Sequence, residues 1–379
     1  MSNHRTEPPG AEGDAAVPLV DQVSRNGPQR REVEEEAAHQ SEGPPRGPVR
    51  PAPQSSDETL PSVFTGPPST TADVFSDEML LRGGRPPVAG WRRVAWRLSG
   101  GRLRVPLSAR ERRELELVAR IKARAAGPRH IVVLSRKGGV GKTTVTAMVG
   151  AALASVRGDR VISVDCNPDA GSLAHRIHRE TPATITNVLA SRRTITRYAD
   201  LRAYTSQGSS RLEVLASDDD PRISEALTGE DYLALLDLLD NHYNVILADT
   251  GTGILDSGIQ GLLREADQLV VVSSPAIDGG RVAAATLDWL DSHGYRVLRR
   301  KAVAVINGVR RSSLVDLDAM EGIFEQRCRA VVRVPWDPQL EVGGEISLDE
   351  VAANTRQAFL EIAAAIAEGF KVRSPAAHD

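Results

Sequence analysis

A glycine-rich segment, residues 135–144, stands between an apolar run at 131–134 and a helix-forming run at 145–156. The apolar run predicts a buried strand, and a glycine loop between a strand and a helix turns several backbone N–H groups toward one point. Those groups and the partial positive charge of the helix N-terminus form a binding site for phosphate oxygens. The segment therefore predicts an α/β fold in which a nucleotide, ATP or GTP, binds at the end of a parallel strand.

The side chains of this segment indicate how the phosphates are held. Lys142 is placed to reach the β- and γ-phosphate oxygens, and the Thr143 hydroxyl is placed to bind Mg²⁺. The backbone of the neighbouring residues is expected to complete the cradle: Gly138, Gly139, Val140, Gly141 and Thr144. Arg136 occupies the place where the usual G-x-x-x-x-G-K-[ST] pattern has its first glycine, so the first turn of the loop must avoid a positive φ there.

The run K-G-G-V-G-K-T-T at 137–144 resembles the deviant Walker A loop of the MinD/ParA family of ATPases. The resemblance extends over residues 88–368. It implies a SIMIBI-type P-loop NTPase fold, with helices on both faces of a mostly parallel sheet, and ATP and Mg²⁺ as cofactors. It also implies a homodimer that forms around ATP, in which an additional signature lysine, here Lys137, reaches the phosphates held by the other subunit.

Another candidate site residue follows a second apolar run. Residues 245–248 predict a buried strand, and Asp249 follows directly, which is the Walker B arrangement in which a carboxylate holds Mg²⁺ through its water shell. The next segment, 250–253, resembles the loop that senses the γ-phosphate in the MinD/ParA family. Thr143 and Asp249 are therefore the predicted metal-binding residues.

The apolar run at 161–164 ends at Asp165 and resembles the switch I strand end of the same family. The family pattern is D-x-D, whose second acid positions the attacking water, but here Asn167 stands in that place. An amide can hydrogen-bond to a water molecule but cannot accept its proton, so we expect slow ATP hydrolysis, with Asp169 as an alternative group. The predicted catalytic residues are Lys137, Lys142, Asp165, Asn167 and Asp249.

Two downstream segments match the positions that recognise the base in this family. An apolar run ends in Asn307, which pairs with adenine in relatives, and the segment Pro335, Trp336 and Asp337 resembles the loop that covers the base. Asn and Pro also favour ordinary strand exits and turns. Together the two segments favour ATP over GTP.

Apolar runs alternate with helix-like segments through the rest of the chain, which is typical of a parallel sheet covered on both faces. The predicted strands lie near 160–165, 211–215, 244–249, 268–273, 302–307 and 330–334. One predicted helix begins after Gly229 and another spans 282–293. The inward-facing residues of the first are expected to be Tyr232, Leu235, Leu236 and Leu239.

The chain has 379 residues and a formal net charge of −3. These overall values hide a strong segregation of residue types along the sequence. Of its 23 prolines, 14 lie within the first 90 residues, so residues 1–86 are predicted to be disordered. The other predicted divisions are a basic linker and helix at 87–127, the ATPase domain at 128–370 and a flexible tail at 371–379.

The sequence favours a cytoplasmic protein. No apolar h-region lies near the N-terminus, and no run reaches the ~20 apolar residues that a membrane span requires, so we expect neither a signal peptide nor integral membrane association. Peripheral attachment to a membrane through a partner stays open. Cys166 and Cys328 are too few for a disulfide framework and suit a reducing compartment.

A basic segment, residues 92–129, precedes the glycine loop and contains twelve Arg or Lys against three Glu. Ser108 and Glu111 form a capping-box pattern that predicts a helix. The apolar face of that helix is expected to consist of Leu115, Val118 and Ile121. The arginines fit non-specific binding to DNA, an anionic lipid surface or an acidic partner, and they equally fit the solvated face of a helix that docks on the ATPase domain.

Apolar residues recur at helical spacing near the C-terminus: Val351, Thr355, Phe359, Ile362, Ile366 and Phe370. MinD proteins use a C-terminal amphipathic helix to bind membranes, but here the polar face carries Glu361 and Glu368, and only Lys371 and Arg373 are basic nearby. An anionic leaflet would attract each cation by about 1 kcal/mol and repel the acids. We therefore predict that this helix packs on the ATPase core.

Softer features resemble the actinobacterial MinD-like ATPases associated with type VII (ESX) secretion, the EspI-like group. These features lie at 90–93, 98–101, 165–171, 249–253 and 286–290. Three functions stay open: an ATP-switched regulator of type VII secretion with partners in the secretion machinery, a ParA-like partitioning ATPase that binds DNA, and a scaffold that binds ATP with negligible hydrolysis.

Overall fold

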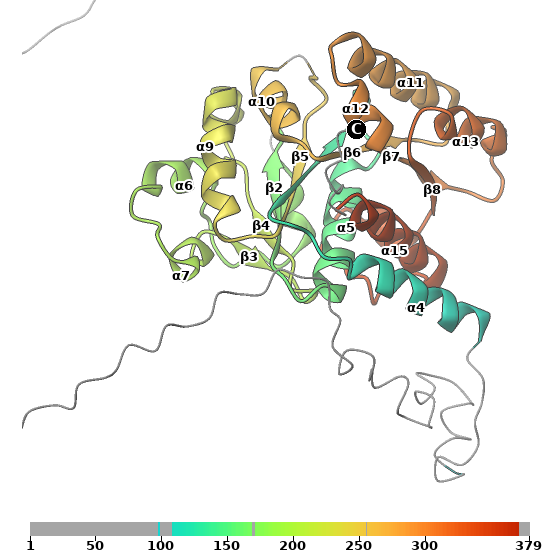
Figure 1. The fold of residues 1–379 in the computed structure, drawn as a ribbon, viewed down its shortest axis with the longest axis horizontal. Helices are drawn as coiled ribbons and strands as arrows, with labels where there is room; N and C mark the ends of the chain where they lie inside the picture. Colours follow the sequence, from blue (N-terminus) through green and yellow to red (C-terminus); the bar gives the residue numbers. More distant parts are fainter. Residues whose placement is uncertain (1–97, 99–107, 169–170, 255, 371–379) are drawn as a thin grey trace, which may run out of the picture. The chain divides into compact units, whose positions relative to one another are not determined.

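A single sheet forms the centre of the fold (Figure 1). Within the residues that the computed structural model describes, 98, 108–168, 171–254 and 256–370, eight strands join in the order β3-β4-β2-β5-β1-β6-β7-β8. They are β1 (Arg129–Leu134), β2 (Val161–Cys166), β3 (Ser206–Gln207), β4 (Glu213–Leu215), β5 (Val245–Thr250), β6 (Gln268–Ser273), β7 (Val303–Val309) and β8 (Ala330–Pro335). Only the β3–β4 pair of this described sheet is antiparallel. The predictions for 1–86, 371–379 and Asp169 fall outside the described residues.

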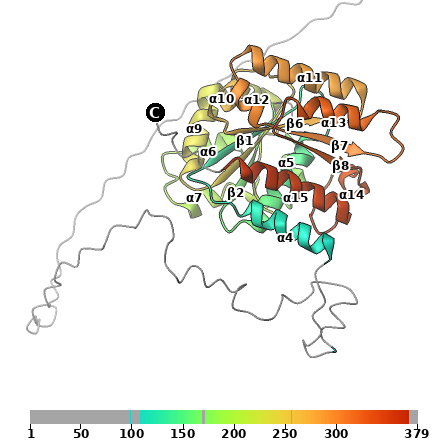
Figure 2. The ribbon, with the colours of Figure 1, turned by 45° about the vertical axis from the view of Figure 1, so that its right-hand side comes forward.

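Helices connect the strands and cover both faces of the sheet (Figure 1 and Figure 2). On one face lie α4 (Ala109–Ile121), α5 (Lys142–Val156) and α15 (Ala353–Glu368). The other face is covered by α6 (Ile185–Ser191), α9 (Gly229–Asp240), α10 (Ser257–Glu265), α11 (Ile277–Ser292), α12 (Arg296–Lys301) and α13 (Leu317–Glu325). Shorter helices are η1 (Leu173–Arg176), α7 (Tyr198–Arg202), α8 (Pro221–Glu225) and α14 (Pro338–Glu341).

Each central strand contributes to two hydrophobic cores, because successive side chains point to opposite faces of a sheet. On β1, Ile131 and Val133 join the core formed with α4, α5 and α15, whereas Val132 and Leu134 join the core formed with α9, α10 and α11. Strands buried on both faces read as continuous apolar runs. The predicted α/β class, with a mostly parallel sheet between helices, is confirmed.

Most predicted elements lie where the sequence indicated. The strands expected near 160–165, 244–249, 268–273, 302–307 and 330–334 correspond to β2, β5, β6, β7 and β8, and α9 buries the four expected side chains. The predicted start of the helix over 282–293 was wrong, because α11 begins at Ile277 and runs through Gly279 and Gly280. A Cβ at Gly279 would collide with Ser274, so this glycine serves a close approach to the end of β6 rather than a loop.

The strand predicted over 211–215 is a short hairpin, in which β4 pairs with the two-residue β3. A two-residue strand is too short to produce a periodic pattern, so β3 was not predicted. Arg211, in the connecting turn, has a positive φ of 70°. Its guanidinium donates to the carbonyls of Ala154 at 2.6 Å and Arg157 at 2.8 Å, which ties the hairpin to the end of α5.

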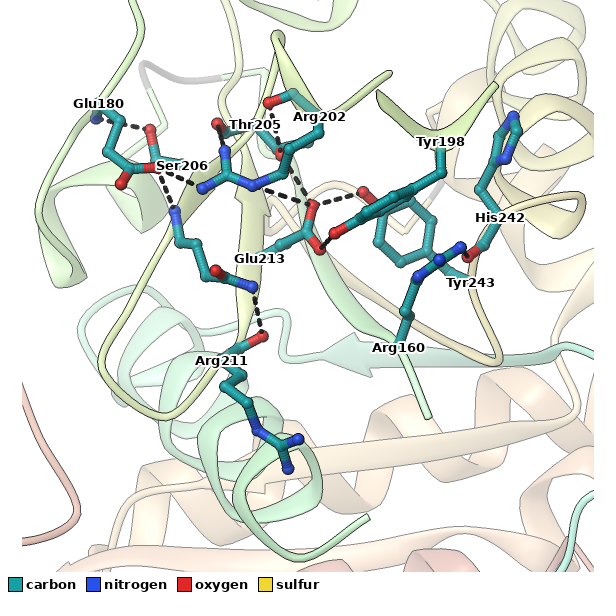
Figure 3. Close-up of polar contacts among 11 residues, drawn as sticks. Arg160, Glu180, Tyr198, Arg202, Thr205, Ser206, Arg211, Glu213, His242 and Tyr243 are labelled. Carbon is teal, nitrogen blue, oxygen red and sulfur yellow. Dashed lines mark hydrogen bonds and ion pairs between the residues drawn. The ribbon is translucent and has the colours of Figure 1, made fainter. Parts of the chain in front are cut away.

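A buried carboxylate organises this edge of the sheet (Figure 3). Glu213 on β4 accepts hydrogen bonds from the Tyr198 hydroxyl at 2.6 Å, the Tyr243 hydroxyl at 2.7 Å and Thr205 Oγ1 at 2.8 Å. The Arg202 guanidinium lies 4.0 Å away. Burial and the bond to Glu213 raise the pKa of Tyr198 to about 12, so the phenol remains a donor at neutral pH. A buried carboxylate with this many partners stabilises local structure rather than binding a ligand.

α4 begins with the predicted capping box between Ser108 and Glu111. Its predicted apolar face was right for Ile121, which is buried, and wrong for Leu115, which is exposed; Leu117 is buried instead and Val118 is half-buried. Leu117 and Ile121 are one helical turn apart and belong to the core formed with α5 and α15. Contacts with a neighbouring helix, which the pattern of α4 alone does not contain, therefore set its rotation.

Charge pairs fix α4 against α15. Arg113 and Arg120 form ion pairs of 2.8 Å with Glu361 and Glu368. These glutamates were predicted to repel an anionic membrane, and in the structure they bind the basic helix instead. On the opposite side, the buried guanidinium of Arg157 donates to the carbonyl of Ile121 at 2.8 Å.

The C-terminal helix packs on the core as predicted. The buried side chains of α15 and the residues that flank it include Thr355, Phe359, Ile362, Ile366 and Phe370. Gln268 on β6 donates to the Ile366 carbonyl at 2.8 Å, which joins the end of α15 to the sheet. Within the described part of the chain, no helix is long and apolar enough to cross a membrane.

Phe359→Ala should lower the free energy of unfolding by about 3–5 kcal/mol, because it opens a cavity beneath α15. Glu361→Gln on the same helix is the matched control and should change it by less than about 1 kcal/mol, since its ion pair is partly exposed. Urea unfolding followed by circular dichroism measures both. Equal stability of Phe359→Ala and the control, together with lost binding to anionic vesicles, would instead identify α15 as a membrane anchor.

Candidate nucleotide-binding site

The glycine loop connects β1 to α5. α5 begins at Lys142, ahead of the predicted start at 145, and its N-cap is Gly141, which has no side chain to satisfy the first N–H groups of the helix. Gly139 and Gly141 have φ values of 74° and 87°, a region that residues with a Cβ rarely adopt. Arg136 is not among the described residues with a positive φ, so the loop accommodates it without strain. The loop thus presents N–H groups without side-chain caps at a helix N-terminus.

A cavity of about 600 Å³ opens at this loop. From the loop and α5 it is lined by Gly138, Gly139, Val140, Gly141, Lys142, Thr143 and Thr144. From the ends of β2, β7 and β8 it is lined by Asn167, Asn307, Pro335, Trp336 and Asp337. The carboxyl edge of the sheet therefore brings these predicted residues together, whereas Lys137, Asp165 and Asp249 are not part of the lining.

Asp249, on β5, is buried beside the loop. Its Oδ1 accepts a hydrogen bond from Thr146 Oγ1 at 2.9 Å, and its Oδ2 is buried without a hydrogen-bond partner among the described residues. Burial raises the pKa of Asp249, and the nearby hydroxyls of Thr143 and Thr146 and the charge of Lys142 oppose this rise. A carboxylate oxygen that lacks a partner beside a threonine hydroxyl fits a hard cation such as Mg²⁺.

Asp165, on β2, lies directly opposite Asp249 in the parallel register. Its Oδ2 accepts a hydrogen bond from the Leu173 N–H at 2.8 Å, and its Oδ1 accepts one from the Asn167 N–H at 3.3 Å. Burial, followed by the charge of Asp249, raises the pKa of Asp165 to about 7. Each buried carboxylate disfavours the charged form of the other, so a cation between the sheet and the loop would stabilise both.

Asn167 contacts the segment that follows β5. A Cβ added to Gly251 would lie 2.9 Å from Asn167 Oδ1 and 2.8 Å from the Pro168 ring. Thr252, like Asn167, lines the cavity. The segments that resemble switch I and the γ-phosphate sensor therefore pack against each other at the cavity wall.

Asn307 holds the glycine loop in place. Its Nδ2 donates to the Val140 carbonyl at 2.9 Å, and a Cβ on Gly141 would collide with the same amide. This contact ties β7 to the loop. Recognition of adenine by Asn307 stays a prediction.

Trp336 and Asp337, the two residues that follow β8, have different structural roles. Asp337 is buried and caps α14, because its Oδ1 accepts from the Gln339 N–H at 3.1 Å, and its Oδ2 accepts from the N–H of Ala352, the residue before α15, at 2.8 Å. The ring of Trp336 is partly exposed at the cavity, and the Arg310 guanidinium lies 4.3 Å from its centroid. Trp336 therefore offers an aromatic face on which a base can stack.

Lys137 is engaged within its own chain. Its ammonium forms an ion pair with Asp278 at the start of α11, and this pairing holds the pKa of Asp278 below its usual value. Asp278 was not predicted as a partner, because 141 residues separate the two in the sequence. Any contact of Lys137 with a second subunit must replace this ion pair.

Arg176, at the end of η1, also lines the cavity and was not predicted from the sequence. No sequence motif marks Arg176. It follows Asn167 by nine positions, and only the path of the chain after β2 brings it to the site.

In the described part of the basic segment, Arg113 and Arg120 bind α15 and Arg129 pairs with Asp267 at 2.9 Å. Binding of DNA, lipid or an acidic partner by the segment stays a prediction.

A glycine loop between β1 and α5, with a buried carboxylate on the adjacent parallel strand, defines the fold of a P-loop NTPase. The sequence model of the CobQ/CobB/MinD/ParA nucleotide binding domain, CbiA, matches residues 131–373. The chain therefore belongs to this family, and the predicted resemblance to MinD/ParA proteins is confirmed.

Among curated proteins, the chain is similar to the ESX-1 secretion-associated protein EspI of Mycobacterium tuberculosis. The two are 39% identical over 285 residues, which cover 74% of this chain but only 42% of EspI. The chain thus matches less than half the length of that relative. It is also 30% identical over 194 residues to the septum site-determining protein MinD of Synechocystis, covering 51% of this chain and 68% of MinD.

Solved structures share the fold. A ParA family ATPase from Chlorobium tepidum has a TM-score of 0.54 at 19% identity and covers 62% of this chain and 98% of its own. MinD of Pyrococcus horikoshii, complexed with Mg-ADP, has a TM-score of 0.51 at 22% identity and covers 62% of this chain and 94% of its own. At these identities the likeness shows the fold alone.

The raised pKa of Asp165 predicts a pH dependence of stability. Between 3.8 and about 7 the nucleotide-free folded state binds more protons at this pair than the unfolded state does, so the pair's contribution to stability should fall as the pH rises. Asp165→Asn removes one charge of the pair and should flatten this dependence, whereas Asp237→Asn on the exposed face of α9 should not. Urea unfolding at pH 5 and pH 8 measures it, and identical slopes for Asp165→Asn and the wild type would contradict the coupling.

Proposed function

We propose that this chain is a switch protein that binds ATP with Mg²⁺, dimerises around the nucleotide and hydrolyses it slowly. The observation that carries the proposal is the phosphate-binding loop beside Asp249, whose Oδ2 is buried without a partner among the described residues. Membership of a nucleotide-binding family supports it. The complex of a related MinD fold with Mg-ADP supports the same ligands.

Different groups of the chain bind the phosphates, the cation and the base. The N–H groups of the loop and the Lys142 ammonium bind the phosphates, while Thr143 and Asp249 hold the cation directly or through water. Trp336 stacks on the base. When bound, Mg²⁺ neutralises charge on the β- and γ-phosphate oxygens.

Slow hydrolysis follows from the groups near the terminal phosphate. The amide of Asn167 can orient a water molecule but cannot accept its proton. Asp165 is not a substitute, since both of its oxygens already accept backbone hydrogen bonds that hold the segment after β2. We therefore assign Asp165 to positioning this segment and propose that a binding partner accelerates turnover.

Dimerisation is proposed through Lys137. Its present partner, Asp278, is 68% exposed on its side chain, so exchanging this ion pair for the phosphates of a second subunit costs little. The transferred lysine would gain contacts with a more concentrated negative charge. Nucleotide binding and dimer formation are thereby linked, as a switch requires.

The cellular role that we propose is regulation of type VII secretion, with partners in the secretion machinery, because the similarity to EspI covers 74% of the chain. A DNA-binding partitioning ATPase is less well supported, since Arg113 and Arg120 are engaged with α15. A scaffold would share every binding group and differ only in turnover. ATP turnover measured alone, with DNA, with anionic vesicles and with secretion components separates the three.

Lys142→Ala should weaken ATP binding by about 100-fold or more, because charge-assisted contacts to the phosphates are lost. Lys301→Ala, an exposed lysine at the end of α12, is the control and should bind normally. Isothermal titration with ATP and Mg²⁺ measures both affinities. Unchanged affinity of Lys142→Ala would refute the loop as the nucleotide site.

Lys137→Ala should bind ATP with nearly normal affinity but fail to dimerise, because its charge acts only when two subunits meet. Asp278→Asn, which releases Lys137, should dimerise at the wild-type concentration or below. Asp288→Asn on the same helix, also 68% exposed, is the matched control. Light scattering with a non-hydrolysable ATP analogue reports the dimer, and normal dimerisation of Lys137→Ala would exclude the signature-lysine role.

A further inference from the structure

Arg176 is a cation that the fold directs into the nucleotide cavity without supplying a counter-ion. It ends η1 and lines the same cavity as Lys142 and Thr143. Its Nε and Nη1 atoms are buried, and neither has a hydrogen-bond partner among the described residues. No ion pair joins its guanidinium to a carboxylate of the described residues.

Among the described residues, the two buried arginines are paired with carboxylates, whereas the half-buried Arg176 is not. Arg157 pairs with Asp159, and Arg299 pairs with Asp291 at 2.6 Å. Burial lowers the pKa of Arg176, and only the charge of Asp249 opposes this. A partly buried guanidinium without a partner destabilises the nucleotide-free protein. An anionic ligand that binds in the cavity would supply the missing partner.

The main chain at Arg176 is nevertheless held from both sides. The Leu173 N–H donates to Asp165, and the Arg176 carbonyl accepts a hydrogen bond from the Ile346 N–H at 3.0 Å. Two residues further on, His178 lies 3.5 Å from Glu345. A fixed backbone with an unpartnered charged side chain is the arrangement that preorganises a binding residue.

The position of Arg176 in the sheet order indicates which part of a nucleotide it meets. The chain reaches η1 from β2, next to β5 and Asp249, whereas Asn307 and Trp336 follow β7 and β8 on the other side of β1. Arg176 shares this side of the cavity with Asn167 and Ser172, which also follow β2. A bound Mg²⁺ would be held on this side by Thr143 and Asp249, so the terminal phosphate of a bound nucleotide would lie there.

We propose that Arg176 binds the γ-phosphate of ATP within its own subunit and makes the site discriminate ATP from ADP. The inference rests on the proposed function and adds to it the residue that distinguishes ATP from ADP. Because hydrogen bonds join η1 to Asp165 and to Ile346, a contact that forms only with a triphosphate acts on both. Arg176 therefore differs from Lys142, which also reaches the β-phosphate that ATP and ADP share.

Arg176→Met tests this, since it removes the charge and keeps most of the side-chain length. We expect the affinity for a non-hydrolysable ATP analogue with Mg²⁺ to fall by about 10- to 100-fold, as for loss of a charged hydrogen bond. The affinity for ADP should change by less than about threefold. His175→Ala, an exposed neighbour on η1, should leave both affinities unchanged, and Arg176→Lys should restore part of the preference for the triphosphate.

Thermal unfolding without nucleotide separates binding from a structural role. Arg176→Met should melt at the wild-type temperature or above, because an uncompensated buried charge is removed. A lower melting temperature, an equal loss of affinity for both nucleotides, or no loss for either would overturn the inference. If the wild type binds both nucleotides and Arg176→Met keeps the wild-type preference for ATP over ADP, only this inference fails. If the wild type binds neither nucleotide, the proposed function fails as well.

Discussion

The site depends on two carboxylates that the sheet places side by side. β2 and β5 are parallel neighbours, and their register sets Asp165 opposite Asp249. Burying two like charges is unfavourable unless donors or cations surround them. Asp165 is satisfied by backbone N–H groups that shape the next segment, whereas Asp249 keeps one buried oxygen without a partner in the described chain. Under the proposed function, a divalent cation with its anionic ligand would neutralise this pair of carboxylates.

The cations around the cavity are arranged in a complementary way. Lys142 stands at the loop, Arg176 lines the wall from the β2 side, and Lys137 is held by Asp278 on α11. Each comes from a different element, so each responds to a different event. Under the proposed function, Lys142 binds the nucleotide, Arg176 distinguishes a triphosphate from a diphosphate, and a second subunit competes with Asp278 for Lys137. The proposal thus assigns a link between nucleotide state and assembly to these three cations.

Charges elsewhere in the chain show what a purely structural arrangement looks like. Glu213 is as buried as Asp249, but three hydroxyl groups donate to it (Figure 3). Arg157 is engaged with Asp159 and with the end of α4, and the ion pairs between α4 and α15 join the basic helix to the core. The contrast between satisfied and unsatisfied buried groups is therefore what separates scaffold from site.

The sequence by itself determined the parallel sheet, the phosphate loop and the strand ends that carry Asp165, Asp249 and Asn307, because continuous apolar runs and glycine patterns are local signals. It also determined that α15 packs on the core. Only the tertiary structure decided that Leu117 rather than Leu115 is buried, that Asp278 binds Lys137 and that Arg176 enters the cavity. Helix rotation, ion pairs between distant segments and the path of a short connection depend on neighbours far away in the chain, which no local pattern records.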